Sequence, residues 1–280
     1  MKNFHLHLVS DSTGETVNSV ARAALAQFDD VHPHEHIWPL LRTKGQLEKM
    51  IINLDTNPGV VMYTLVDASM REMLRAACAK RGLPCIPILS HVVRDLSNYL
   101  EIEAAGSPGS QHELGEHYFS RIDAINFALE HDDGQAAWNL EQADIVLVGV
   151  SRTSKSPTCV YLAHRGFKSA NVPYVPGCPL PENLMELKQP LIVGLTISGE
   201  RLIDIRTSRL ESLKQNLDSD YVNSEHVRAE IEEARRMFRQ QGWPVIDVTR
   251  RSVEETAAHI IQYRQRQVEK RQMEKNHGAF

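Results

Sequence analysis

Apolar and polar residues alternate along this chain with two different periods. In the first part, short apolar runs of the strand type lie at residues 4–9, 35–41, 59–66 and 84–89. Between and after them, helical spacing covers 17–28, 44–54, 68–81 and 92–103. Such an alternation of strands and helices predicts a parallel sheet that is covered by helices on both faces.

The stretch "AAGSPGSQHELG" at residues 104–115 interrupts the alternation, and its Gly, Ser and Pro content is typical of a linker. Beyond it, helical spacing covers 117–134, 157–165, 199–217, 224–241 and 253–270. Strand-like runs lie at 143–150, 190–198 and 244–249, and "VPYVPG" at 172–177 continues the alternation. We therefore predict an α/β protein with two halves and mainly parallel sheets. Its parts are an N-terminal α/β domain at 1–105, a linker and connecting helix at 106–138, and a C-terminal domain at 139–280.

Composition and charge narrow the class of protein. The chain has 280 residues, of which 42% are hydrophobic and 24% are charged, as in folded soluble proteins. The formal net charge of -5 gives no whole-chain reason to expect binding to nucleic acid or to an anionic membrane. The first residues lack the apolar core of a signal peptide, and the longest apolar runs are too short to span a bilayer. We expect a cytoplasmic protein with neither nucleic acid nor membrane as a partner.

Thiols and imidazoles raise the question of a bound metal. The sequence holds four cysteines, Cys78, Cys85, Cys159 and Cys178. None forms a C-x-x-C pair or lies at a zinc-finger spacing from a histidine, so reduced and mostly buried thiols are the simpler interpretation. In "HPHEH", His32, His34 and His36 alternate as strand residues do. Metal binding is one interpretation of that pattern, and an exposed strand or loop edge is the more common one.

The stretch "VLVGVSRTSKSPTCVYLA" at 146–163 joins a strand-like run to a helical one. Gly149, Lys155 and Ser156 occupy positions of the phosphate-binding pattern G-x-x-x-x-G-K-[ST], and Ser154 replaces the second glycine. Backbone N–H groups at a helix N-terminus favour phosphate, Lys155 would neutralise the terminal phosphate, and Ser156 would hold Mg²⁺. The alternative is an ordinary strand–turn–helix with a chance Lys-Ser pair. We predict a P-loop-like nucleotide site, with Lys155 also catalytic, at Gly149, Val150, Ser151, Arg152, Thr153, Ser154, Lys155 and Ser156.

A second polar loop, "SDSTGET" at 10–16, also lies between a strand-like run and a helical one. It offers four hydroxyl groups, Gly14 and the acidic Asp11 and Glu15, but no cation. Loops rich in Ser and Thr commonly cap a helix. The sequence leaves a capping loop and a phosphate site equally open here.

A third candidate is "RIDAINFALEHDDG" at 121–134. Its acids Asp123, Asp132 and Asp133 could bind Mg²⁺ or accept the proton of a hydroxyl group. The alternative is a solvated helix end, although two acids are unfavourable at a helix C-terminus. We select Asp132 and Asp133 as catalytic candidates, with Asp11 and Asp123 in reserve.

Several of these stretches occur together in one order. "SDSTGET", "SRIDAINFALEHDDG", "GVSRTSKSPTCVYLAHRGFKSANVPYVPG" and "PLIVGLTIS" extend over almost the whole chain. Together they resemble the bacterial regulatory-protein family that acts on pyruvate, phosphate dikinase or on phosphoenolpyruvate synthase. The resemblance implies a bifunctional enzyme. In one direction ADP, not ATP, phosphorylates a threonine of the target, and in the other inorganic phosphate removes that group and releases pyrophosphate.

The resemblance also implies the ligands and the partner. ADP would be the phosphoryl donor, with Mg²⁺, and the family's nucleotide loop corresponds to residues 149–156. "RGFKSANVPYVPGCPLPENL" is more similar to the dikinase-directed branch, so we expect pyruvate, phosphate dikinase as the protein substrate, with the synthase as the alternative. A homodimer stays open. Rival interpretations are a non-catalytic nucleotide sensor and an ATP-dependent kinase for a small molecule.

Overall fold

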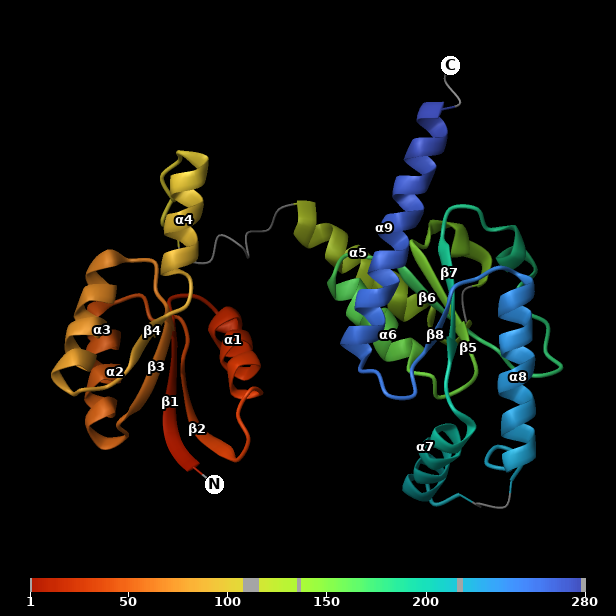
Figure 1. Cartoon of the computed structure of the whole chain (residues 1–280), viewed down its shortest axis with the longest axis horizontal. Helices are drawn as coiled ribbons and strands as arrows, with labels where there is room; N and C mark the ends of the chain where they lie inside the picture. The colour runs from red at the N-terminus through yellow and green to blue at the C-terminus, as the bar shows by residue number, and fades with distance from the viewer. Residues whose placement is uncertain (1, 108–115, 135–136, 216–218, 278–280) are drawn as a thin grey trace. The chain divides into compact units, whose positions relative to one another are not determined.

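The computed structural model describes residues 2–107, 116–134, 137–215 and 219–277. The chain divides into two compact units, Met1–Glu113 and Leu114–Phe280 (Figure 1). Most of the linker predicted at 104–115 lies outside the described residues. Among the helices that are described, none has the length and apolar character that crossing a membrane requires.

The first unit is a parallel sheet with helices on both faces, and its strands are ordered β2-β1-β3-β4. Figure 1 shows α1 on one face and α2 and α3 on the other. Its elements are β1 (Lys2–Ser10), α1 (Glu15–Leu25), β2 (Val31–Trp38), α2 (Lys44–Thr56), β3 (Gly59–Thr64), α3 (Ala68–Lys80), β4 (Cys85–Pro87) and α4 (Ser90–Leu100).

The apolar residues of β1 explain why helices cover both faces of this sheet. Successive side chains of a strand point to opposite faces. Leu6 and Leu8 pack with Val17 of α1, whereas Val9 packs with Leu47 of α2 and other residues of the opposite layer. A capping box, in which Thr43 and Gln46 exchange hydrogen bonds, fixes the start of α2.

Two elements of the first unit differ from expectation. Strand β2 spans Val31–Trp38 rather than residues 35–41, and Pro33 is tolerated because β2 is an edge strand. Helix α4 spans Ser90–Leu100 rather than residues 92–103, and it buries none of its described residues.

The second unit repeats the architecture with the strand order β6-β5-β7-β8, again all parallel. Its elements are α5 (Glu116–Glu130), the 3-10 helices η2 (Asp132–Gly134) and η3 (Ala137–Gln142), β5 (Ile145–Gly149), α6 (Lys155–His164), β6 (Ser169–Pro173), the 3-10 helix η4 (Glu182–Glu186), β7 (Leu191–Thr196), α7 (Gly199–Ser212), α8 (Ser224–Gln240), β8 (Val245–Asp247) and α9 (Val253–His277). The two parallel sheets confirm the predicted α/β class.

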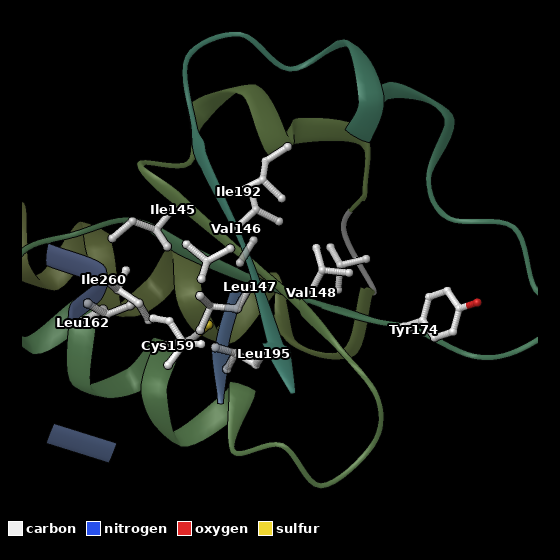
Figure 2. Close-up of a cluster of buried hydrophobic side chains, with 14 of the residues drawn as sticks. Ile145, Val146, Leu147, Val148, Cys159, Leu162, Tyr174, Ile192, Leu195 and Ile260 are labelled. Carbon is white, nitrogen blue, oxygen red and sulfur yellow. The ribbon is translucent and has the colours of Figure 1, made fainter. Parts of the chain in front are cut away.

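Strand β5 lies in the core of this unit, and all five of its residues are buried. Figure 2 shows Leu147 near Cys159 and Leu162 of α6, while Val146 lies beside Ile192 of β7. In Figure 1, α5, α6 and α9 lie on one side of this sheet and α8 on the other. Helix α8 approaches β7 closely, because a Cβ atom on Gly194 would lie 2.4 Å from the ring of Phe238.

The helix predicted at 117–134 ends earlier, at Glu130, and Asp132–Gly134 forms a separate 3-10 turn. The turn is sharp because Asp133 has a left-handed backbone, with φ of 51°. Helix α5 contributes Ala124 and Phe127 to the core of the second unit, so it is part of that unit's packing. Helix α7 ends at Ser212 rather than near residue 217, and 216–218 lie outside the described residues. Within the described residues all four cysteines are free, Cys78 and Cys159 being buried.

Candidate active site

The 149–156 loop leaves the carboxyl end of β5, where the order β6-β5-β7 reverses the direction of the crossovers. Ligands of parallel α/β sheets bind in the crevice at such a point. The backbone is tightly packed there. A Cβ atom on Gly149 would lie 2.7 Å from the carbonyl oxygen of Leu195 and 2.9 Å from Oγ1 of Thr153. Only glycine fits this position without a local shift.

The loop holds two non-glycine residues in the left-handed region, Arg152 with φ of 74° and Ser154 with φ of 58°. Such residues cost about 1–3 kcal/mol each and cluster at functional sites. Ser154 is the position at which the phosphate-binding pattern has its second glycine, so serine adopts the conformation that glycine would adopt freely. Among the described residues, the side chain of Ser154 forms no capping hydrogen bond at the start of α6. The first N–H groups of α6 therefore receive no cap from this serine.

Lys155 lies directly under the loop. Its side chain is only 5% exposed, and Nζ donates a hydrogen bond to the carbonyl oxygen of Val150 at 3.0 Å. Burial lowers the pKa of Lys155 to about 8, although the nearby Asp133, Cys159 and Asp132 act in the opposite direction. The loop thus keeps a partly desolvated cation, which gains interaction energy when an anion approaches.

A polar network joins the loop to the acids of η2. Ser156 donates from Oγ to Oδ1 of Asp132 at 2.8 Å. The amide Nδ2 of Asn171 lies 2.6 Å from the same Oδ1, 3.0 Å from Oγ of Ser156 and 3.2 Å from Oδ1 of Asp133. The structure therefore brings together four residues selected from the sequence, Lys155, Ser156, Asp132 and Asp133.

Asn171 was missed by the sequence analysis. It is 1% exposed, in the middle of the otherwise small and apolar strand "SANVP". A buried amide requires hydrogen-bonding partners. That requirement is the signal that could have identified it.

The 149–156 loop, Asp133 and Asn171 border a cavity of about 330 Å³. This volume lies at the lower end of the range for small-ligand sites. Cations, hydroxyl groups and one carboxylate line it together, a composition suited to a phosphorylated ligand. The lining residues are Asp133, Ser151, Arg152, Ser154, Lys155, Ser156, Pro157, Asn171, Pro173 and Ile205.

A buried ion pair packs against the 149–156 loop. Arg206 is 2% exposed and bonds Glu230 through both terminal nitrogens, at 2.8 and 2.9 Å. It also donates to the carbonyl oxygen of Ser151 at 3.3 Å and lies over the ring of Tyr221, 4.4 Å from the ring centre. Arg206 and Ser151 are 55 positions apart in the chain, so local spacing could not predict their contact.

Tyr221 reaches the loop directly. Its hydroxyl lies 3.3 Å from Oγ of Ser151 and accepts a hydrogen bond from Nε of Arg152 at 3.4 Å. Burial alone would raise the pKa of Tyr221, but these two hydrogen bonds and the charges of Arg206 and Arg152 outweigh it and lower the pKa. Tyr221 therefore ties two loop residues to the arginine beneath them.

The reserve acids lie elsewhere. Asp123 is exposed on α5, outside the lining of this cavity. Asp11 belongs to the first unit, where it is 5% exposed and Oδ2 accepts the N–H of Val66 at 2.6 Å. Burial raises the pKa of Asp11, against hydrogen bonds from the backbone and the charges of Arg42 and Arg71.

The "SDSTGET" loop borders a smaller cavity of about 160 Å³ in the first unit. Polar groups of this loop form hydrogen bonds within the first unit. Oγ of Ser10 accepts hydrogen bonds from the N–H of Ser12 at 3.1 Å and from the hydroxyl of Thr64 at 3.0 Å. These bonds do not cap α1, whose N-cap residue Gly14 has no side-chain capping hydrogen bond, so the capping-loop interpretation is not confirmed.

Comparisons with known proteins identify the family of this chain. The model of the Kinase/pyrophosphorylase family matches residues 6–261. A protein of Paramagnetospirillum magneticum is 56% identical over 271 residues, which are 97% of this chain and 87% of the relative. One of Caulobacter vibrioides is 55% identical over 258 residues, 92% of this chain and 82% of the relative. Both are named "Putative pyruvate, phosphate dikinase regulatory protein". This chain belongs to the Kinase/pyrophosphorylase family.

Proposed function

We propose that this protein phosphorylates a threonine of pyruvate, phosphate dikinase with ADP as donor, and removes the phosphoryl group with inorganic phosphate. Family membership and the names of the relatives support the reaction type and the target. The observation that carries the assignment to this site is that Lys155, Ser156 and Asp133 line one cavity, with Asp132 hydrogen-bonded to Ser156. Phosphoryl transfer depends almost entirely on positioning and on charge stabilisation, which this group of residues supplies.

The phosphates of ADP bind at the start of α6 in this proposal. The N-terminus of a helix favours anions. Lys155 exchanges its bond with the carbonyl oxygen of Val150 for a phosphate oxygen, whose negative charge favours the protonated amine. Arg152, which also lines the cavity, adds a second cation at the rim.

Mg²⁺ fits the oxygen atoms of Ser156 and Asp132. Mg²⁺ prefers hard oxygen ligands, and this hydroxyl and this carboxylate already lie 2.8 Å apart. When bound there, it would neutralise charge on the phosphates. Asn171 keeps the carboxylate of Asp132 in place through its amide.

Asp133 is our candidate for the base. A threonine hydroxyl is a poor nucleophile until a positioned base takes its proton. Asp133 lines the cavity and is exposed, so an incoming protein side chain can reach it. Asp132 is less suited, because one of its oxygens already accepts from both Ser156 and Asn171.

One site serves both directions. In the forward reaction, the threonine oxygen attacks the β-phosphorus of ADP, AMP leaves, and Asp133 holds the released proton. In the other direction, inorganic phosphate attacks the phosphorus of phosphothreonine, the bond from that phosphorus to the threonine oxygen breaks, the threonine oxygen takes up a proton, and pyrophosphate is released. Pyrophosphate is the α,β fragment of ADP, so inorganic phosphate occupies the place of the α-phosphate. Lys155 and the α6 backbone then stabilise the same in-line transfer.

We place the reaction in the cytoplasm, where thiols stay reduced, and the four free cysteines support this. The decisive experiment incubates purified pyruvate, phosphate dikinase with this protein and ADP labelled at its β-phosphate. We expect label on a threonine of the dikinase and AMP as coproduct. Matched arms contain γ-labelled ATP, or phosphoenolpyruvate synthase as the target.

Transfer from ATP alone would replace ADP as the donor, and labelling of the synthase alone would change the target. ADP binding without any transfer would leave a nucleotide sensor. In the dephosphorylation assay, AMP should compete with inorganic phosphate. If it does not, the two reactions use separate sites.

A further inference from the structure

Three imidazoles meet at the outer edge of the first sheet. We call His5 of β1 and His34 and His36 of β2 the histidine cluster. The parallel register pairs His5 with His34 and His7 with His36. Paired residues of neighbouring parallel strands share a face, as do residues two apart in one strand, so the three rings lie on one face.

The rings of the histidine cluster converge with nearly equal spacing. Their centres are 5.3 Å apart for His5 and His34, 5.1 Å for His5 and His36, and 5.0 Å for His34 and His36. One nitrogen of each ring lies within 4.8 Å of the other two. A tetrahedral ion with bonds of about 2.0–2.1 Å needs ligand nitrogens about 3.3 Å apart. Small rotations of the side chains would therefore close the site.

His7 holds one of these rings in place without being a ligand itself. Both of its nitrogens have partners, Nε2 the carbonyl oxygen of Asn57 at 2.8 Å and Nδ1 the indole N–H of Trp38 at 3.3 Å. Its ring stacks on His36, with centres 4.5 Å apart and planes 10° apart. Supporting contacts of this kind orient the ligands in metal sites.

The histidine cluster lies within reach of solvent. His34 is exposed and His5 and His36 are half-buried, so an ion can enter from water.

We propose that the histidine cluster binds a divalent transition metal ion of the zinc type through three imidazoles, with a fourth position open to water. Three nitrogen donors suit Zn²⁺, Co²⁺, Ni²⁺ or Cu²⁺ and not Mg²⁺, so the site is chemically distinct from the phosphoryl-transfer site. The ion joins the edge strand β2 to β1 near the start of β3, because His5 is also the register partner of Gly59. Its role is to stabilise the pairing of the edge strand β2 with β1.

The test uses the untagged full chain carrying Cys178→Ser, because Cys178 is an exposed thiol that could bind metal by itself. Co²⁺ is titrated in, and the visible absorption of tetrahedral Co²⁺ is recorded. Zn²⁺ should displace it at one ion per chain, and Mg²⁺ should not. His34→Gln is the diagnostic variant because this residue is exposed. Its affinity should fall at least about tenfold, since even changes to supporting groups cost 10–100-fold.

His32→Gln is the matched control, on the same strand and face but outside the cluster, and it should bind Co²⁺ normally. Circular dichroism confirms that each variant is folded. Zn²⁺ should also raise the unfolding temperature of the parent and the control, but not of His34→Gln. Absence of the cobalt spectrum, or equal Co²⁺ affinity in parent and His34→Gln, would overturn the proposal.

Discussion

Each unit has a polar loop between its first interior strand and the helix that follows. The buried charge of that loop is negative in the first unit and positive in the second. In each, the loop follows the interior strand that comes first in the chain, β1 or β5, and leads into the next helix. Both helices begin after a left-handed residue, Gly14 with φ of 86° and Ser154 with φ of 58°. The first loop buries the carboxylate of Asp11, and the second buries the ammonium of Lys155.

This difference shows what the fold decides and what the residues decide. A parallel sheet with this strand order forms a crevice at the carboxyl ends of its strands. A buried cation makes that crevice attractive to phosphate, whereas Asp11 is already bonded to the N–H of Val66 and repels anions whenever it is ionised. We infer that only the second loop is a phosphoryl-transfer site.

The largest effect should come from the acids. Asp133→Asn should lower turnover about 10²–10⁴-fold, which is the usual contribution of a general base, and leave ADP affinity unchanged. Asp11→Asn, in the loop of the first unit, should leave turnover unchanged. Asp123→Asn, at an exposed residue, should also leave it unchanged. Steady-state kinetics and calorimetric ADP binding separate the two quantities. Weakened binding of Mg²⁺-ADP with intact turnover would make Asp133 a metal ligand.

Lys155→Ala should lower the rate of both directions by about 10²–10³-fold, because one charge contact with the developing transition state is lost. The fold should stay intact, since the variant removes a buried charge while Asp132 and Asp133 keep their hydrogen bonds from Ser156 and Asn171. The matched variant Ser12→Ala, in the first loop, should leave both directions unaffected. Selective loss of dephosphorylation in Ser12→Ala would assign inorganic phosphate to the first loop and remove the contrast between the units.

The pH dependence of binding should reveal the buried cation. Lys155 has a pKa of about 8 in the free protein, so it is charged below that pH and neutral above it. Anion binding requires the charged form, and ADP affinity should fall as pH rises above 8, by up to about tenfold per unit. Lys155→Arg should flatten the profile because arginine stays protonated. A flat profile in the parent would show that Lys155 does not meet the phosphates.

The smallest effect is a reciprocal exchange at the two left-handed positions. Gly14→Ser should lower the free energy of unfolding by about 1 kcal/mol, because serine is strained there even though the added Cβ has room. Ser154→Gly should raise the free energy of unfolding by up to about 1 kcal/mol, because the strain is relieved. The greater conformational freedom of glycine in the unfolded chain offsets part of this gain. Urea denaturation measures both changes. A loss of stability in Ser154→Gly would mean that the serine side chain contributes contacts that outweigh the strain.

The sequence predicted those parts of the fold that depend on local apolar pattern. The run "IVLV" is buried on both faces as β5, which is why it could be recognised without its neighbours. Residues 31–34 of β2 lay outside the predicted apolar run at 35–41, although the alternation of His32, His34 and His36 allowed an exposed strand edge; they are held in the sheet by pairing with β1. Long-range pairing, rather than hydrophobicity, sets the start of that strand.

The candidate site was predictable to the same extent. Lys155 and Ser156 follow from their spacing to Gly149, and Asp132 and Asp133 from their unfavourable place after a helix. Asn171 bonds Asp132 from 39 residues away, and the support from Arg206 and Tyr221 comes from a loop and helices beyond β7. Such contacts depend on how the elements pack.

In each unit the strand that is synthesised first lies in the interior of the sheet, and this affects the order of folding. Both β1 and β5 are interior strands whose partners are synthesised later, so their ladders form only after crossover segments have closed. The buried core clusters of the first unit draw on residues up to Ile88, among those described. The core of the second unit includes Ala257 and Ile260 of α9, so it cannot close before residue 260 has been synthesised. We expect the first unit to fold during translation. The apolar β5 should stay unpaired and exposed until the rest of its sheet has been synthesised.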